Sequence, residues 1–308
     1  MAKLCIIGAG AVGTAAAHWA AVKAVAEEIV LIDIVPDLAR GKALDIAQSA
    51  PVYGFSCRVW GTEDFGALKG SDVVILTAGR PRKPGMSRED LLRTNLEVVR
   101  SCAEAVRDLA PESILIVVTN PIDAMVYAAF RTTGFPRNRV LGMAGVLDSA
   151  RYRYFIAEAL GVSPRDVQAL VMGIHGDHML PLTRLANVAG IPVTDLLPPE
   201  KISEIVERTR KGGGEIVSYL KTGSAFTCPG LAAVEMAGAV LRDEKRVFTC
   251  SVWLEGEFGF SEVFIGVPVV LGAGGLERVL TFELTEEERK ALKASVESVR
   301  KQMALTGL

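Results

Sequence analysis

The sequence predicts an α/β protein in which a doubly wound parallel sheet is followed by an α+β half. Up to about residue 143, short apolar runs alternate with amphipathic segments, as expected for strands that helices cover on both faces. A glycine-rich turn follows the first of these runs, and beyond residue 144 the regular alternation stops. We therefore expect two closely packed domains, at residues 1–143 and 144–308, with a cleft between them.

The elements of the first half follow one another as strand, helix, strand. Strands are expected at 4–7, 29–33, 57–60, 72–78, 114–118 and 139–143, and helices at 12–22, 37–48, 87–109 and 121–133. Because such crossovers are right-handed, the strands should run parallel in one sheet. In the second half we expect helices at 146–160, 200–221, 229–242 and 285–305, and strands at 167–173, 247–255 and 261–271.

Composition limits the classes of function. The chain has 308 residues, half of them apolar, and its 34 basic and 36 acidic side chains leave a net charge of −2. A chain so balanced lacks the broad positive field that would hold nucleic acid or an anionic membrane. Its five cysteines include no CxxC pair, so we expect reduced thiols and no metal site built on cysteine.

The N-terminal segment 4–22 is uncharged and follows Lys3, and it superficially resembles a signal peptide. Its three glycines and its change from a strand-like to a helix-like pattern indicate instead the start of a folded domain. We therefore expect a soluble cytoplasmic protein with no membrane partner.

A dinucleotide-binding turn is predicted directly after the first strand. The motif GxGxxG is formed by Gly8, Ala9, Gly10, Ala11, Val12 and Gly13. Such a turn lets the backbone approach a pyrophosphate at a helix N-terminus. The second strand ends in Asp33, whose carboxylate can bind ribose hydroxyls and would repel the 2′-phosphate of NADP. The predicted cofactor is NAD, and a glycine turn in an ordinary α/β domain is the alternative.

The segment 173–178 (GIHGDH) places His175 in a turn between two glycines, after an apolar run. An imidazole there could accept the hydroxyl proton when a secondary alcohol loses hydride. A structural turn histidine is one alternative. A metal site that includes Asp177 and His178 is another, although no further histidine or CxxC pair completes a tetrahedral set.

Two groups of basic residues are candidates for binding an anionic substrate. Segment 80–88 combines four basic residues with two prolines and a glycine, and it follows a strand at the edge where open α/β sheets bind ligands. We interpret residues 80–90 as a lid, with a solvated basic loop or a small nucleic-acid patch as alternatives. Asp148 and Arg151 share one face of the helix 146–160, and an intrahelical ion pair is the alternative to a functional role.

These segments together resemble the lactate/malate dehydrogenase family, in particular its malate-specific members. The resemblance rests on GAGAVG (8–13), LIDIV (31–35), GKALDIAQ (41–48), TAGRPRKPGMSREDLLRTN (77–95), VVTNPIDAM (117–125), GMAGVLDSARYR (142–153), GIHGDHMLP (173–181) and KTGSAF (221–226). It implies an NAD-binding Rossmann domain followed by a catalytic domain. It also implies reversible oxidation of (S)-malate to oxaloacetate.

The resemblance implies roles for individual residues. His175 would exchange the proton, while Asp148 would orient the imidazole and raise its pKa. Arg151 would bind the carboxylate beside the reacting carbon. Arg88 would polarise the carbonyl, and Asn120 would hydrogen-bond the substrate oxygen. Cofactor contacts would come from one further group of residues: Asn95, Val118, Thr119 and Asn120.

Arg82 carries the predicted substrate specificity, because the lactate-specific members have glutamine there. It would bind the second carboxylate of a C4 dicarboxylate. A charge-assisted pair contributes ~1.5–3 kcal/mol, and an enclosed unpaired guanidinium would add a penalty with pyruvate. These magnitudes predict a preference of at least ~100-fold. Three departures from the family's pattern, at Ile174, at His178 and at Cys228 with Pro229, are expected to alter pH dependence or packing rather than the reaction.

The predicted function is therefore NAD-dependent malate oxidation with malate or oxaloacetate as the small-molecule partner. Lactate dehydrogenase is the alternative within the same class. An NAD-dependent glycosidase, which would need a metal, and a non-catalytic NAD-binding module are alternatives from other classes. The resemblance also implies a homodimer or homotetramer, with helices 37–48, 146–160 and 229–242 as interface surfaces.

Overall fold

A single sheet of nine strands forms the centre of the molecule, in the order β14-β13-β12-β6-β5-β4-β1-β2-β3. The computed structural model describes residues 2–80 and 88–308, and only the backbone of residues 88 and 89. The six parallel strands are β1 (Lys3–Ile7), β2 (Glu28–Ile32), β3 (Arg58–Thr62), β4 (Val73–Leu76), β5 (Ile114–Val117) and β6 (Val140–Gly142). The predicted strands and the doubly wound order are confirmed.

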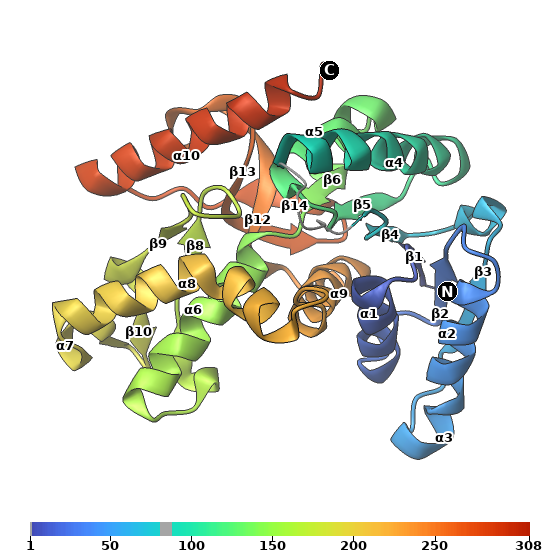
Figure 1. The fold of residues 1–308 in the computed structure, drawn as a ribbon, viewed down its shortest axis with the longest axis horizontal. Helices are drawn as coiled ribbons and strands as arrows, with labels where there is room; N and C mark the ends of the chain where they lie inside the picture. The colour runs from blue at the N-terminus through green and yellow to red at the C-terminus, as the bar shows by residue number, and fades with distance from the viewer. Residues whose placement is uncertain (1, 81–87) are drawn as a thin grey trace.

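Helices cover both faces of this sheet, which is why its central strands are apolar on both sides (Figure 1). One face carries α1 (Ala11–Val22), α2 (Leu38–Gln48), the short α3 (Ala50–Tyr53) and α9 (Thr227–Leu241). The other face carries α4 (Arg88–Leu109), α5 (Ile122–Thr133) and α10 (Glu286–Ala304). Small residues let α1 and α9 pack closely: a Cβ on Gly230 would lie 2.8 Å from the backbone nitrogen of Ala16.

Strands from the second half extend the sheet instead of forming one of their own. They are β12 (Arg246–Glu255), β13 (Ser261–Gly272) and β14 (Gly275–Val279), which pair antiparallel with one another. Ser251 of β12 pairs with Gly142 of β6. The sequence predicted β12 and β13 but not that they join the first sheet, because a hairpin's own pattern does not specify its outer partner.

The remaining elements form a smaller layer beside the sheet. They are α6 (Gly145–Leu160), α7 (Val193–Leu196), α8 (Pro199–Leu220), β7 (Val167–Gln168), β8 (Val171–Met172), β9 (Leu180–Pro181), β10 (Asn187–Val188) and β11 (Ile191–Pro192). The described residues also form five 3-10 turns: η1 (Phe65–Leu68), η2 (Arg137–Arg139), η3 (Pro164–Asp166), η4 (Thr183–Leu185) and η5 (Glu257–Gly259). The continuous strand expected at 167–173 is wrong. β7 pairs with β10 and β8 with β9, so the run is divided between two small sheets.

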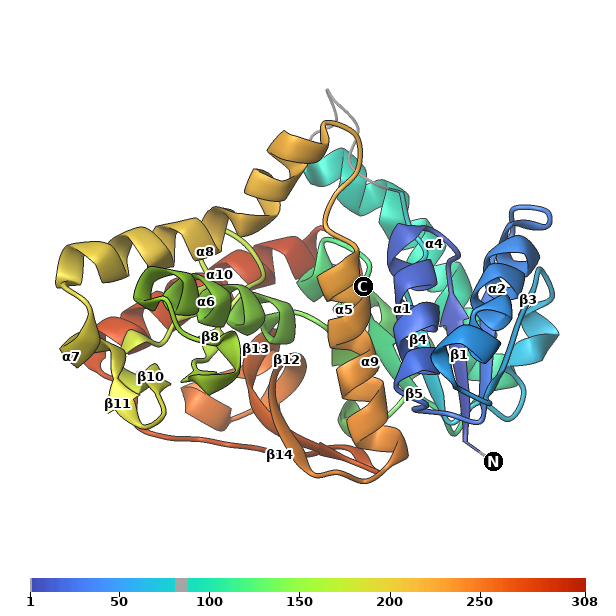
Figure 2. The ribbon, with the colours of Figure 1, turned by 90° about the horizontal axis from the view of Figure 1, so that it is seen from below.

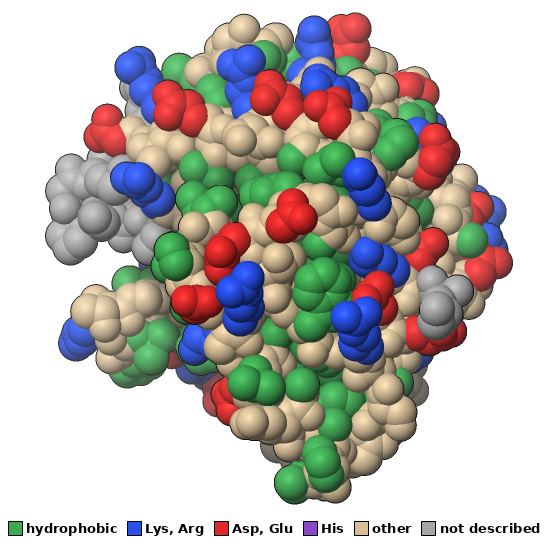
Figure 3. All heavy atoms as spheres, turned by 90° about the vertical axis from the view of Figure 1, so that its right-hand side faces the viewer, with side chains coloured by type: hydrophobic (Ala, Val, Ile, Leu, Met, Phe, Trp, Pro, Cys, Tyr) green, Lys and Arg blue, Asp and Glu red, His purple; other side chains and the backbone are tan. Residues whose placement is uncertain are grey.

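Helix α9 lies between α1 and α6, as Figure 2 shows, and so connects the two layers. A large apolar core follows the nine-stranded sheet, and a smaller one lies between α6 and α8 around Tyr152 and Ile202. On the face drawn in Figure 3, acidic and basic side chains are interspersed. Within the described part of the chain, no helix has the length and apolar character needed to cross a membrane.

Candidate active site

The glycine turn between β1 and α1 has the geometry of a phosphate-binding loop. Gly8 has a φ of +108°, which favours glycine, and a Cβ on Gly13 would lie 1.8 Å from the carbonyl oxygen of Gly8. Helix α1 then begins at Ala11 with no side chain capping its N-terminus. Its first N–H groups are therefore available for an anion, and the helix dipole favours negative charge there.

Asp33 lies beside this turn, at the end of β2. One carboxylate oxygen accepts a hydrogen bond from the backbone N–H of Ala9 at 2.6 Å, and the other accepts one from the N–H of Val35 at 2.9 Å. The carboxylate is thus held at the edge of the sheet next to the phosphate-binding loop. Gly13 and Asp33 are 20 residues apart in sequence, and the structure places the acid in contact with the glycine turn through Ala9.

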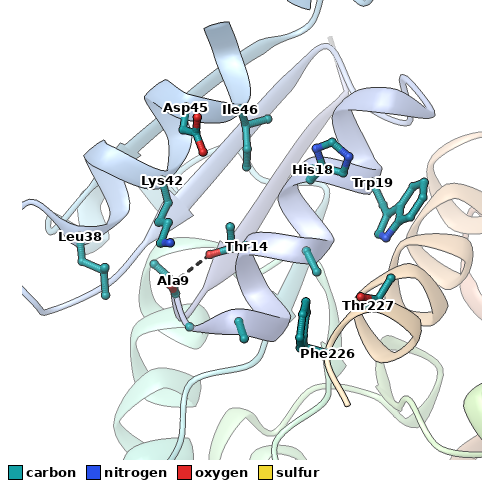
Figure 4. Close-up of a pocket in the computed structure, with 13 residues that line it drawn as sticks. Ala9, Thr14, His18, Trp19, Leu38, Lys42, Asp45, Ile46, Phe226 and Thr227 are labelled. Carbon is teal, nitrogen blue, oxygen red and sulfur yellow. Dashed lines mark hydrogen bonds between the residues drawn. The ribbon is translucent and has the colours of Figure 1, made fainter. Parts of the chain in front are cut away.

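A cavity of about 760 Å³ opens from the glycine turn into the space between α1 and α2 (Figure 4). Its lining combines the turn with polar and apolar side chains from three helices: Ala9, Gly10, Ala11, Thr14, Ala15, His18, Trp19, Leu38, Lys42, Asp45, Ile46, Phe226 and Thr227. The Thr14 hydroxyl donates a hydrogen bond to the carbonyl of Ala9 at 3.1 Å and so fixes the turn from within α1.

Asn95 joins three segments at the carboxyl ends of the strands. Its Oδ1 accepts a hydrogen bond from the N–H of Arg80 at 2.7 Å, and its Nδ2 donates to the carbonyls of Arg80 at 3.2 Å and Asn120 at 2.7 Å. The side chain is buried. Asn95 therefore holds the start of the basic segment 80–88 against the loop after β5, where Val118 and Thr119 are also buried.

His175 and Arg151 both contact the carboxylate of Asp148. Nδ1 of His175 lies 2.8 Å from one oxygen of Asp148, and Nη1 of Arg151 lies 3.3 Å from the other. Asp148 is 2% exposed, whereas the side chains of His175 and Arg151 are 21% and 13% exposed. The structure thus brings together the three residues that the resemblance implied. The carboxylate of Asp148 is buried, whereas the imidazole of His175 and the guanidinium of Arg151 are partly exposed.

The protonation of His175 depends on its charged neighbours. Burial on its own lowers the pKa of this imidazole, but the charge and hydrogen bond of Asp148 raise it by more. Arg151 lowers the pKa and Asp123 raises it, and the net pKa is above the ordinary value of 6.5. The site therefore favours the imidazolium form, which can donate a proton near neutral pH.

Glycines of α8 leave room for the Arg151 side chain. A Cβ on Gly212 would lie 3.2 Å from Cδ of Arg151, and one on Gly213 would lie 3.7 Å from both terminal nitrogens. Three consecutive glycines inside a helix reduce its stability by about 1 kcal/mol each relative to alanine. The sequence run KGGGE at 211–215 is the signal of this close approach, because glycines are otherwise unfavourable inside a helix.

Three further polar residues beside the histidine were also missed. Asp123 accepts a hydrogen bond from the backbone N–H of His175 at 3.2 Å and another from the hydroxyl of Ser251 at 2.7 Å. Ser295 of α10 accepts one from the N–H of Ile174 at 2.6 Å and donates to the carbonyl of His178 at 3.1 Å. Buried side chains on α5 and α10 thus hold the turn that carries His175.

Two of the predicted substrate-binding residues lie at or beyond the limit of the described side chains. Arg82 lies outside the described residues, and Arg88 is described only as the first residue of α4. Asn120 is exposed at the end of β5, next to the cofactor-side network of Asn95. Among the described residues, no three His, Cys, Asp or Glu side chains are grouped so that they could hold a metal ion.

The fold and the site together define a dinucleotide-binding α/β protein with a paired histidine and aspartate. The family model for the NAD-binding domain of lactate/malate dehydrogenases matches residues 2–142, and the model for the α/β C-terminal domain of that family matches residues 145–306. The chain belongs to the lactate/malate dehydrogenase family, and its cofactor is NAD.

Individual relatives match over their whole length. The malate dehydrogenase of Roseiflexus sp. (strain RS-1) is 52% identical, covering 98% of this chain and 97% of its own. Malate dehydrogenase 1 of Anaeromyxobacter dehalogenans (strain 2CP-C) is 53% identical, covering 99% and 98%. Among solved structures, the malate dehydrogenase of Picrophilus torridus in its apo form has a TM-score of 0.96 at 46% identity, covering 99% and 97%. A lactate dehydrogenase of Cryptosporidium parvum, complexed with lactic acid and the nicotinamide cofactor, has a TM-score of 0.96 at 40% identity, covering 99% and 98%.

Proposed function

We propose that this protein is an NAD-dependent malate dehydrogenase that interconverts (S)-malate and oxaloacetate. The observation that carries the proposal is the shared carboxylate of Asp148, 2.8 Å from His175 and 3.3 Å from Arg151. A 2-hydroxy acid has a hydroxyl and a carboxylate on the same carbon. An imidazole and a guanidinium fixed side by side match those two groups.

The residues of the first half fit the cofactor. Gly10 has no atom within 4 Å of an added Cβ and lies at the uncapped N-terminus of α1, where a pyrophosphate would bind. Asp33 would bind the adenosine ribose. The nicotinamide, when bound, supplies the hydride acceptor or donor. We assign residues 1–143 to cofactor binding and 144–308 to catalysis and substrate binding.

In malate oxidation, neutral His175 accepts the hydroxyl proton at its Nε2, because Nδ1 is engaged by Asp148. Asp148 stabilises the imidazolium that results. Arg151 binds the carboxylate next to the reacting carbon. In the reverse direction, the imidazolium donates the proton to oxaloacetate, and Asp148 favours this protonated form by raising the pKa of His175.

The remaining substrate contacts are assigned to three residues, of which Arg88 is the first residue of α4. Arg88 would polarise the reacting carbonyl and Asn120 would hydrogen-bond the same oxygen. Arg82 would bind the distal carboxylate of the diacid. Arg151 and Arg82 would thus each bind one of the two carboxylates of the substrate, and closure of residues 80–90 would exclude water and strengthen these contacts.

Steady-state assays test the proposal. The wild type should reduce oxaloacetate with NADH much faster than with NADPH, and should prefer oxaloacetate to pyruvate and 2-oxoglutarate. Replacing His175 by Asn should lower turnover by ~10²–10⁴ with NADH binding retained. Full activity of that variant would remove the histidine from the mechanism.

A second comparison tests the role assigned to Arg82. Arg82→Gln should reduce the preference for oxaloacetate over pyruvate by ~10- to 100-fold, because one charge-assisted pair is lost. Lys83→Gln is the matched control, since it removes one positive charge from the same segment. An oxaloacetate-to-pyruvate ratio that is the same in Arg82→Gln and the wild type would show that the assignment is wrong.

Lactate dehydrogenase is the second candidate, because similar structures include lactate dehydrogenases at 40% and 37% identity. The names of the relatives at 52% and 53% identity, together with Arg82, favour malate. A glycosidase activity is not favoured by these comparisons.

We further propose that the enzyme is a cytoplasmic homodimer or homotetramer. Apolar side chains are exposed on α2 and α3, with Leu44 59%, Val52 91% and Tyr53 61% exposed, which is typical of a contact surface. Sedimentation equilibrium of the wild type and of Leu44→Glu would test this surface. A wild type that remains a monomer at micromolar concentration would exclude it.

A further inference from the structure

The turn that carries His175 is anchored by a buried carboxylate to which the proposed reaction assigns no role. Asp123 is 1% exposed, and both of its oxygens are used outside its own helix: one by the N–H of His175, the other by the hydroxyl of Ser251. An aspartate in the first turn of a helix is ordinarily stabilised by the free N–H groups and the dipole of that helix, but α5 has no side-chain hydrogen bond capping its N-terminus. Asp123 is thus directed at the histidine turn instead.

We propose that Asp123 is a positioning residue for the proposed malate dehydrogenase reaction: it fixes the backbone of His175 and supplies the negative charge that balances the imidazolium. This inference rests on the proposed function, because it explains how the position and the protonation of the same histidine are set. The geometry that supports it is the pair of hydrogen bonds from two other elements, the 173–178 turn and β12.

One carboxylate does not balance the positive charges of both protonated His175 and Arg151. Asp148 divides its two oxygens between His175 and Arg151, so a single negative charge faces two groups that can both be positive. Asp123 adds the second negative charge. With the imidazole protonated, the four groups then sum to zero.

Among the described residues, two titratable groups act on the pKa of Asp123, in addition to its burial. His175 faces it from the turn and lowers its pKa, and Asp148 on α6 raises it, while Arg151 contacts Asp148. Burial is the largest effect and raises the pKa of Asp123 to about 6. The carboxyl group is therefore ionised above pH 6, where it raises the pKa of His175.

Ser295 provides a matched control within the same turn. It holds the N–H of Ile174 and the carbonyl of His178, it is fully buried, and it carries no charge. Ser295→Ala removes turn anchoring alone. Asp123→Asn keeps the size of the side chain and removes its charge. Its carbonyl oxygen can still accept from the N–H of His175, while its NH2 group would donate to the hydroxyl of Ser251, which can act as an acceptor.

The experiment is an NMR titration of the histidine ring signals in the full-length protein with and without NADH. The chain has only His18, His175 and His178, so single substitutions of the other two assign the signals. In Asp123→Asn, the pKa of His175 should fall relative to the wild type. In Ser295→Ala, it should stay at the wild-type value.

The pH dependence of oxaloacetate reduction gives the second readout. That reaction needs the imidazolium, so Asp123→Asn should lower kcat/KM about tenfold at pH 8, and the two enzymes should converge below pH 6, where Asp123 is itself protonated. Ser295→Ala should lower the rate by the same factor at every pH. A histidine pKa that is unchanged in Asp123→Asn, or equally lowered in Ser295→Ala, would overturn the inference. A wild type inactive on oxaloacetate would instead overturn the proposed function, and the NMR titration would still test Asp123.

Discussion

Replacement of Gly10 by alanine separates the folding role of the glycine turn from its cofactor role. The three motif glycines differ in what an added methyl group would meet. At Gly8 it would lie 2.7 Å from the backbone nitrogen of Ala78, and at Gly13 it would lie 1.8 Å from the carbonyl oxygen of Gly8. At Gly10 it would meet no atom within 4 Å. The fold therefore needs Gly8 and Gly13, whereas Gly10 faces open space, where the proposed pyrophosphate would bind.

The magnitude follows from this open space. A methyl group on Gly10 would project where the pyrophosphate meets the N-terminus of α1, and displaced phosphate oxygens would lose one or two hydrogen bonds from backbone N–H groups. Each such bond to a charged group contributes ~1.5–3 kcal/mol, so the Kd for NADH should rise by at least ~10-fold. The free energy of unfolding should change by less than ~1 kcal/mol, because the φ of −68° suits alanine.

The assay compares fluorescence titration with NADH and thermal unfolding without cofactor, for the wild type, Gly10→Ala and Gly13→Ala. Gly13→Ala should lose more than ~3 kcal/mol of stability, because the clash is with backbone. The reasoning fails if Gly10→Ala binds NADH as tightly as the wild type. It also fails if Gly10→Ala is destabilised as much as Gly13→Ala.

Three further predictions concern the histidine site and the packing of α1 against α9. Asp148→Asn removes the attraction between this carboxylate and the His175 imidazolium, which is worth ~4 kcal/mol at about 4 Å and an effective dielectric constant near 20. The pKa of His175 should therefore fall. In pH–rate profiles, oxaloacetate reduction should be ~10²–10³-fold slower at pH 8 and should partly recover toward pH 6. Gly230→Ala should cost ~1–3 kcal/mol in urea unfolding, whereas Gly238→Ala, whose Cβ would lie 3.4 Å from a valine methyl group, should stabilise the same helix by up to ~1 kcal/mol. Burial raises the folded-state pKa of Asp123 to about 6, above ~3.9 in the unfolded chain. Because the carboxyl group ionises less readily in the folded state, the free energy of unfolding of the wild type should fall as pH rises from 4 to 6. The Tm of Asp123→Asn should therefore exceed that of the wild type by more at pH 8 than at pH 5.

The parts of the site that could be predicted from the sequence are those that local chain geometry determines. The motif 8–13 fixes a strand, a turn and a helix within a few residues, so its structure follows from glycine conformation and helix dipoles. The His175–Asp148 contact joins residues 27 apart, and it was expected only because the surrounding segments resemble a known family. Neither composition nor spacing distinguishes Asp148 from an aspartate in an exposed ion pair.

Asp123 and its partner Ser251 could not be predicted, because their contacts depend on how the two halves of the chain join. Asp123 reaches the N–H of a residue 52 positions away, and Ser251 lies 128 positions from Asp123. Ser251 arrives there because β12 pairs with β6 opposite Gly142, where an added Cβ would lie 2.9 Å from that of Ser251. The same close approach that extends the parallel sheet into the second half therefore places a hydroxyl under Asp123. It follows that a side chain larger than hydrogen at Gly142 would disturb the anchoring of His175 as well as the sheet.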